Sequence, residues 1–228
     1  MRRAIEEQLE KALPKFLKKK CHKVPWQERS ILMSEAFAFC GIGDLFDIDI
    51  VLESGIWLGR STEIFASYFA PRRVVAIDVT LKKVMVERLE KYDNLTLIQG
   101  DGPAHIRSIL KDSKIKRAGI FIDGPKESRA VMCAEQFLAY ENVSFVAVHD
   151  AHKSKVKRML VNLNRPLFFT CEKKFLEKYS KFDRGESQWD EKQKMRWVPH
   201  WIVARDNRKF GLGAYGPTVG FVFNSKEF

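Results

Sequence analysis

The chain has 228 residues, of which 45% are hydrophobic and 12% aromatic, a composition that excludes disorder and suits a globular fold with a full core. No segment has the ~18–20 apolar residues of a membrane span, and the charged stretch from Met1 to Lys20 lacks the apolar core of a signal peptide. The four scattered cysteines form no metal-ligand pair, which favours reduced thiols and a cytoplasmic location.

The formal net charge of +11 bears on the choice of partner. Basic residues concentrate over 15–20, 153–158 and 173–208. Such a surface is typical either of a lysine-rich protein whose charges are simply solvated, or of one that binds nucleic acid, an anionic membrane surface or an acidic glycan. Because the clusters are loose, the solvated surface is the simpler interpretation.

Residues 1–45 predict a helical extension. Apolar residues recur near helical spacing over 3–20, with charges between them: Ile5, Leu9, Leu13, Phe16 and Leu17. Pro14 is expected to kink or divide this helix. A second helix is predicted from Pro25 to about Cys40. We expect both helices to pack against the following domain or to help cover its ligand cleft.

Residues 46–228 predict an α/β domain. Five short apolar runs are each followed by an acid, at gaps of 25, 23, 22 and 27 residues: Glu53, Asp78, Asp101, Asp123 and Asp150. Strand-like runs joined by helix-length segments are typical of a parallel sheet, and ligands bind beyond the carboxyl ends of such strands. All five carboxylates are therefore expected at one rim, where they suit polyhydroxyl groups, cationic groups or a metal, and repel phosphates.

The alternation of strand-like runs and helix-length segments stops after Pro166. Two further strands are predicted over 167–171 and 217–223, separated by a basic, aromatic insertion at about 172–213. An insertion of this length between strands is usually functional or mobile. Its three tryptophans are interpreted either as a substrate lid that excludes water or as a surface for a partner protein.

The turn after the first strand of the domain reads Glu-Ser-Gly-Ile-Trp-Leu-Gly-Arg-Ser-Thr over 53–62. Gly55 permits a positive φ, Gly59 permits close approach of a ligand, and Ser61 or Thr62 can cap a helix whose N-terminus attracts an anion. The nicotinamide fingerprint is not matched, because position 57 is Trp, and the Gly-Lys-Ser/Thr of a phosphate-binding loop is missing. Trp57 is expected to pack beneath the N-terminal helices, with a wall of the ligand pocket as the alternative.

Three acids indicate what this loop would bind. Asp78 could accept two hydrogen bonds from a ribose diol. Asp101, between two glycines, could meet an adenine amino group, and Glu53 could lie near a cationic amino group. A carboxylate at a helix N-terminus, an ammonium, a ribose and an adenine together describe S-adenosylmethionine.

Residues 49–150 resemble class I S-adenosylmethionine-dependent methyltransferases, and the 53–62 loop is similar to that of methyltransferase family 24, a group related to cephalosporin-hydroxylase-like and macrolide-sugar O-methyltransferases. The resemblance implies a doubly wound, Rossmann-like sheet that is mostly parallel, with a C-terminal antiparallel strand pair, preceded here by the N-terminal helices. It also implies cofactor contacts at the methionine end, the ribose and the adenine from Glu53, Ser54, Gly55, Gly59, Ser61, Asp78, Asp101, Gly102 and Asp123.

Related enzymes place their chemistry at the ends of the fourth and fifth strands. The resemblance implies catalytic roles for Asp123, His149, Asp150 and His152, with His149 or His152 as general base. Asp123 and Asp150 could share Mg²⁺ that grips a substrate diol, and helix capping and turn formation are the alternative for both. The chain has Asp-Gly-Pro-Lys where many relatives have Asp-Gly-Asp/Glu-His, which argues against the metal.

The expected function is methyl transfer to an oxygen of a small molecule or sugar. A nucleic-acid methyltransferase is one alternative, favoured by the positive charge and the insertion. Against this alternative, the chain lacks the Asn/Asp-Pro-Pro-Tyr/Phe segment that base methylation normally uses. The other alternative is a scaffold that binds the cofactor without catalysis. The sequence leaves the acceptor and the oligomeric state open.

Overall fold

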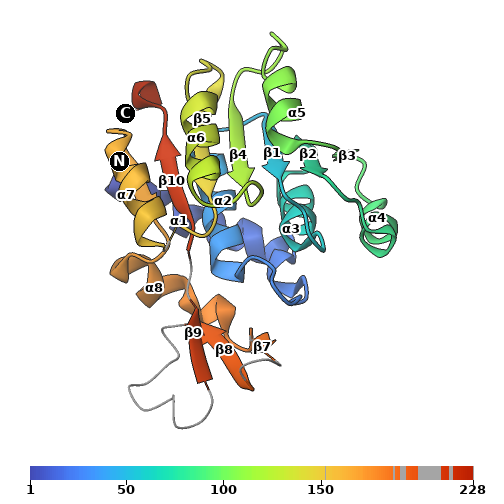
Figure 1. Cartoon of the computed structure of the whole chain (residues 1–228), viewed down its shortest axis with the longest axis vertical. Helices are drawn as coiled ribbons and strands as arrows, with labels where there is room; N and C mark the ends of the chain where they lie inside the picture. The colour runs from blue at the N-terminus through green and yellow to red at the C-terminus, as the bar shows by residue number, and fades with distance from the viewer. Residues whose placement is uncertain (152, 187, 191–193, 200–211, 216–217, 228) are drawn as a thin grey trace.

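The computed structural model describes residues 1–151, 153–186, 188–190, 194–199, 212–215 and 218–227. A seven-stranded sheet in the order β3-β2-β1-β4-β5-β10-β6 lies at its centre (Figure 1). The strands are β1 Ile50–Ser54, β2 Arg73–Asp78, β3 Leu95–Gln99, β4 Ala118–Ile122, β5 Val143–Val148, β6 Leu167–Phe169 and β10 Gly220–Phe223. Strands β1 to β5 pair in parallel, whereas β10 runs antiparallel to β5 and β6. The predicted Rossmann-like sheet with a C-terminal antiparallel pair is confirmed.

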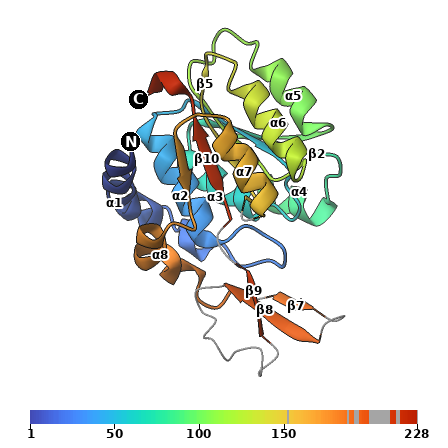
Figure 2. The same ribbon diagram turned by 60° about the vertical axis from the view of Figure 1, so that its left-hand side comes forward.

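Helices cover both faces of the sheet (Figure 2). One face packs against α1 Arg2–Lys18, α2 Met33–Leu45 and α3 Arg60–Phe69, and the other against α5 Gly102–Ile109, α6 Ser128–Phe137 and α7 Ser154–Asn162. A further helix, α4 Lys83–Leu89, packs with Ile56 and Ala76 at the β2 side. Because both faces are covered, the strands are continuous apolar runs, with Phe121 and Phe145 toward α2 and Ile120 and Val146 toward the opposite layer.

The N-terminal helices share the core of the sheet, and their bounds differ from the prediction. Pro14 lies inside α1 without dividing it. It is exposed, so water can reach the carbonyl one turn earlier that loses its N–H partner. The second helix begins at Met33 rather than near Pro25. Residues 24–32 form an irregular segment instead, because the first turn of α2 is fixed by acids from elsewhere in the chain.

The predicted insertion carries structure of its own. It contains α8 Lys173–Tyr179, a 3-10 turn at Ser180–Asp183, and a second sheet of β7 Gln188–Asp190, β8 Met195–Pro199 and β9 Leu212–Tyr215. Helix α8 lies against α1, where Lys174 Nζ is 3.3 Å from Glu6 Oε1. Trp201 lies outside the described residues. Among the helices that the structure describes, none has the length and apolarity to cross a bilayer.

Candidate functional site

A cavity of about 570 Å³ opens where β1, β2, β3 and β4 end. Its size falls within the roughly 300–1,000 Å³ of small-molecule sites. Six residues predicted to bind the cofactor line it: Ser54, Gly55, Asp78, Asp101, Gly102 and Asp123. The carboxyl ends of neighbouring parallel strands meet at this edge, which is where the fold class binds ligands.

Bare backbone lets the loops of the cavity approach one another. Gly55 has φ +92°, and a Cβ on it would lie 2.5 Å from the backbone nitrogen of Gly124 in the loop after β4. A Cβ on Gly102 would collide with the hydroxyl of Ser54. The positive φ of Gly55 agrees with the turn predicted for it, and a side chain at either position would force neighbouring atoms to shift.

Asp78 and Asp101 already organise backbone around the cavity. Asp78 Oδ2 accepts hydrogen bonds from the amides of Ile56 at 2.7 Å and Trp57 at 3.2 Å, and Oδ1 accepts one from Thr80 at 3.1 Å. Asp101 caps α5 by accepting from the amide of Ala104 at 2.7 Å. An ionised carboxylate has about four acceptor sites, so Asp78 keeps about one and Asp101 about three for a ligand.

Glu53 differs from the prediction, because its side chain points away from the cavity. It is fully buried at the end of β1 and accepts hydrogen bonds from Ser61 Oγ and, at 2.6 Å, from Thr62 Oγ1. Burial raises the pKa of Glu53 to about 8 against the lowering effect of these hydrogen bonds, so the group is mostly neutral at pH 7. It holds the first turn of α3 in place of the predicted contact with a cationic ligand.

Gly59 and Ser61 also lie behind the loop rather than in the cavity wall. Gly59 has φ +79°, and a Cβ on it would lie 2.8 Å from Met85 and 2.9 Å from Leu89 of α4. Ser61 is buried against Glu53. In this structure both residues therefore pack the loop and are not among the residues that line the cavity.

The segment 24–32 contributes Arg29 to the wall of the cavity, and covering the ligand cleft was one of the two expectations for this part of the chain. Arg29 lines the cavity together with Trp57. The indole Nε1 of Trp57 donates to the carbonyl of Glu28 at 3.1 Å, and 41% of this side chain is exposed. The preferred expectation that Trp57 packs beneath the N-terminal helices is therefore wrong, and the alternative, a pocket wall, is what the structure shows.

Arg60, at the start of α3, holds the 24–32 segment in place. Its guanidinium donates to the carbonyl of Ile31 at 2.6 Å, lies 2.5 Å from Glu186 Oε1, and stacks 5.1 Å from the ring of Trp26. Arg60 and Glu186 are both buried. Burial raises the pKa of Glu186, and the charge of Arg60 opposes that rise.

Two acids of the insertion cap α2. Asp183 accepts from the amide and the hydroxyl of Ser34, both at 2.7 Å, and Glu186 accepts from the amide of Met33 at 3.3 Å. Carboxylates are favourable at a helix N-terminus, because the first N–H groups there have no partner within the helix. These contacts explain why α2 starts at Met33.

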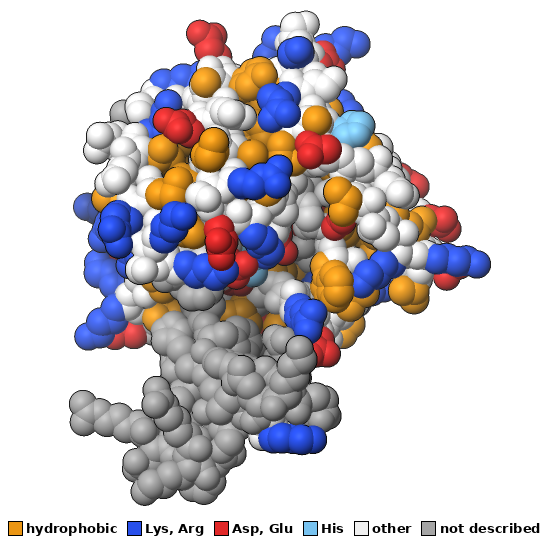
Figure 3. All heavy atoms as spheres, in the orientation of Figure 1, with side chains coloured by type: hydrophobic (Ala, Val, Ile, Leu, Met, Phe, Trp, Pro, Cys, Tyr) orange, Lys and Arg blue, Asp and Glu red, His pale blue; other side chains and the backbone are white. Residues whose placement is uncertain are grey.

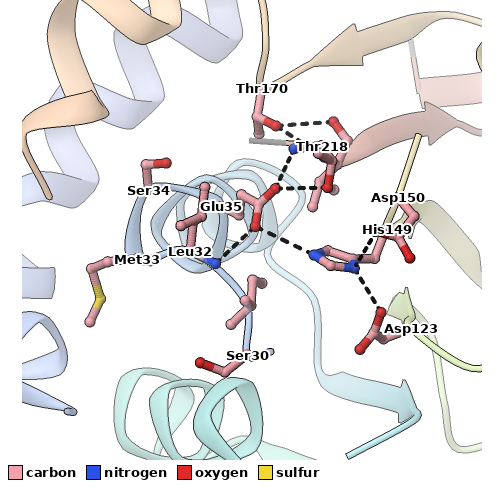
Figure 4. A network of polar contacts seen from close by, with 12 residues as sticks. Ser30, Leu32, Met33, Ser34, Glu35, Asp123, His149, Asp150, Thr170 and Thr218 are labelled. Atoms are coloured by element: carbon pink, nitrogen blue, oxygen red, sulfur yellow. Dashed lines mark hydrogen bonds and ion pairs between the residues drawn. The ribbon is translucent and has the colours of Figure 1, made fainter. Parts of the chain in front are cut away.

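His149, which is not itself a lining residue of the cavity, lies between the carboxylates of Asp123, which does line it, and Glu35 (Figure 4). Its Nδ1 is 2.7 Å from Asp123 Oδ1, and its Nε2 is 3.5 Å from Oε2 of Glu35 in α2. Burial acts to lower the pKa of His149, but the charges of Asp123 and Glu35 and their contacts raise it well above its ordinary value. The geometry therefore favours an imidazolium, which has no lone pair with which to act as the predicted general base. The other candidate base, His152, lies outside the described residues.

Glu35 was missed by the sequence analysis. It is buried, accepts from the amide of Leu32 at 2.9 Å and contacts both the amide and the hydroxyl of Thr218. An acid inside the apolar run Met33–Phe39 is the signal that could have identified it, since such a group is rarely buried without a partner.

The residues proposed to bind Mg²⁺ already hold a cation of their own. Asp123, His149 and Asp150 offer ligand atoms within 4.8 Å of one another. Lys126 Nζ, however, contacts Asp123 Oδ1 and lies 2.9 Å from Asp150 Oδ2. An ammonium between the two carboxylates, with a histidine beside them that favours the charged form, does not fit a divalent ion.

The charges on one face of the molecule are visible in Figure 3. On this face, outside the grey residues, Lys and Arg side chains are spread out with Asp and Glu between them. This pattern agrees with the simpler interpretation of the +11 charge as a solvated surface.

Comparison with known proteins gives partial likenesses. No family model matches the chain. A curated relative, the probable cobalt-precorrin-6B C(15)-methyltransferase (decarboxylating) of Archaeoglobus fulgidus, is 32% identical over 78 residues, which are 34% of this chain. The match spans 43% of the length of that relative.

Solved structures with a similar fold include three methyltransferases. An S-adenosylmethionine-dependent O-methyltransferase of Thermotoga maritima has 12% identity and a TM-score of 0.49, covering 87% of this chain and 67% of that one. The O-methyltransferase TomG of Streptomyces achromogenes has 14% identity and a TM-score of 0.44, covering 69% and 76%. Fibrillarin of Aeropyrum pernix has 14% identity and a TM-score of 0.40, covering 53% and 58%. The strand order of the chain itself, rather than these distant likenesses, identifies the fold.

Proposed function

We propose that this protein transfers a methyl group from S-adenosylmethionine to an acceptor. The observation that carries the proposal is the cavity at the strand ends, where the Gly55 loop, Asp78 and Asp101 with Gly102 stand side by side along one wall. This arrangement supplies a bare backbone, an acid for a ribose diol and an acid for an adenine amino group. The methyltransferase relative of Archaeoglobus fulgidus supports the same activity.

The residues of the cavity would each hold one part of the cofactor. Asp78 would accept from the ribose hydroxyls, and Asp101 from the adenine amino group. Arg29, which lines the cavity beside Trp57, would pair with the carboxylate of the methionine portion in place of the predicted helix N-terminus. When bound, the cofactor supplies an electrophilic methyl group on a sulfonium. Catalysis by the protein then consists mainly of aligning an acceptor atom with that methyl group.

The acceptor is proposed to be an oxygen of a small molecule or sugar. The resemblance of residues 53–62 to methyltransferase family 24 supports this choice. The spread of charges on the face seen in Figure 3 gives less support to nucleic acid. A mobility shift with short RNA that weakens as salt rises would favour the nucleic-acid alternative instead.

The first test is calorimetric titration with S-adenosylhomocysteine, alongside ATP and NAD⁺ as controls. Micromolar binding of S-adenosylhomocysteine is expected, with much weaker binding of ATP and NAD⁺, because the 53–62 loop has neither the Gly-Lys-Ser/Thr of a phosphate-binding loop nor the nicotinamide fingerprint. Equal affinity for all three ligands, or no binding of S-adenosylhomocysteine, would contradict the proposed function. Intact binding without methyl transfer to any pool of acceptors would favour the scaffold alternative.

A further inference from the structure

Lys126 stands at a position where two strand-end loops meet. It follows β4 by four residues, and its ammonium contacts Asp123 from the same loop and Asp150 from the loop after β5. Lys126 also lines the cavity. Lys126 therefore both contacts the two carboxylates and lies in the wall of the cavity where a ligand would bind.

The same carboxylates are the best candidates for a cation site in the part of the chain that the structure describes. With His149 they present ligand atoms within 4.8 Å of one another, and carboxylate oxygens are ligands that divalent ions such as Mg²⁺ use. Lys126 supplies a positive charge at this place from the chain itself. A divalent ion could enter only by displacing it, because two cations on shared carboxylate oxygens repel each other.

We propose that Lys126 is the resident cation of this cavity: its ammonium fills the Asp123–Asp150 site in place of a divalent metal, so the site works without one. A lysine ammonium has three N–H donors. Two are directed at the carboxylates, and among the described residues this leaves one for a ligand oxygen. If the proposed methyl transfer holds, on which this consequence rests, the acceptor oxygen meets a charged donor that favours its ionised form.

Mn²⁺ binding followed by electron paramagnetic resonance tests the occupancy directly, because free and bound Mn²⁺ differ in signal and Mn²⁺ accepts the oxygen ligands that Mg²⁺ uses. The comparison is between the unmodified protein, Lys126→Ala and Lys153→Ala. Lys153 is the matched control, since it pairs with Glu127 at 3.0 Å nearby on the surface and its loss removes the same charge. We expect Lys126→Ala to bind Mn²⁺ at least about tenfold more tightly than the other two proteins.

Two results would overturn the proposal. One is clear Mn²⁺ binding by the unmodified protein that Lys126→Ala does not increase, which would mean that the lysine does not block the site. The other is a folded Lys126→Ala protein that, like the unmodified protein, shows no detectable Mn²⁺ binding, which would mean that the carboxylates are no cation site. Circular dichroism checks folding, and Lys126→Gln, which is one atom shorter but keeps a polar end without the charge, serves if the alanine variant does not fold.

Titration of each variant with S-adenosylhomocysteine separates this proposal from the proposed function. Gain of Mn²⁺ binding in Lys126→Ala without any nucleoside binding would support the lysine-filled site and contradict the methyltransferase. Binding of S-adenosylhomocysteine with unchanged Mn²⁺ affinity in Lys126→Ala would support the methyltransferase and contradict the lysine-filled site.

Discussion

Replacing Arg60 by Met tests whether one buried ion pair holds the 24–32 segment against the loop that follows β1. Arg60 is 2% exposed and Glu186 is 4% exposed. Methionine fills a similar volume but has no donor, so Glu186 loses its counter-ion and the carbonyl of Ile31 loses its hydrogen bond. Breaking a buried pair by removing one partner costs about 3–5 kcal/mol, and we expect a loss of that size in the free energy of unfolding at pH 8.

The loss should shrink in acid. Burial already raises the pKa of Glu186 while Arg60 lowers it, so removing Arg60 raises the pKa further. A carboxyl whose folded pKa lies above its unfolded value of about 4.3 binds protons preferentially in the folded state, and stability falls as pH rises between the two values. Each pKa unit of added difference corresponds to about 1.4 kcal/mol. At pH 5 we therefore expect a penalty about 1–2 kcal/mol smaller than at pH 8.

Urea unfolding of the unmodified protein, Arg60→Met and Arg72→Met at pH 5 and pH 8 measures these differences. Arg72 is the control, because it makes ion pairs with Asp44 and Asp47 at a more exposed position, where a pair contributes roughly 0–1 kcal/mol. S-adenosylhomocysteine should also bind more weakly to Arg60→Met and unchanged to Arg72→Met. A penalty for Arg60→Met that equals the control at both pH values would refute the reasoning.

Three further substitutions address the cavity and the histidine. Asp78→Ala should weaken S-adenosylhomocysteine binding roughly 10- to 100-fold, the value of hydrogen bonds to a charged group, and calorimetry showing unchanged affinity would remove the ribose assignment. Gly102→Ala should lower the same affinity by about tenfold or more, because the new methyl group displaces Ser54; full affinity with an unaltered melting temperature would contradict the close contact. Glu35→Gln should lower the pKa of His149, followed by NMR titration of its ring protons. Protonated His149 stabilises the fold below its unfolded pKa of about 6.5, and this stability is lost as pH rises through the folded pKa. The Glu35→Gln variant should therefore lose less stability than the unmodified protein between pH 6.5 and 9. A pKa of His149 that does not move would show that Glu35 is not its partner.

The sheet could be predicted from the sequence because its physical cause is local. The inner parallel strands β1, β4 and β5 are apolar runs buried along their whole length, and each parallel strand is followed by a helix-length segment. The placement of Asp78 and Asp101 follows from that same pattern, since both come directly after parallel strands. The start of α2 could not be predicted, because it depends on Asp183, which lies 149 residues away in the chain.

The orientation of single side chains at strand ends could not be predicted either. Successive residues of a strand point to opposite faces, so shifting the last turn by one residue decides whether Glu53 or Ser54 faces the cavity. The structure turns Ser54 toward it and Glu53 toward α3. Similarly, the pairing of Lys126 with Asp150 joins residues 24 positions apart, and no spacing rule for a single element covers such a contact.

The capping of α2 by Asp183 and Glu186 has a consequence for the order in which the protein is made. A chain still attached to the ribosome would have produced β1 to β5, and with them most of the cavity wall, before either acid was available. Arg60 would then be without its counter-ion, the 24–32 segment would be without its anchor, and β6 would still wait for β10 to fill the place beside β5. The anchor of the 24–32 segment can therefore form only after residues 183–186 have been made, later than all five parallel strands.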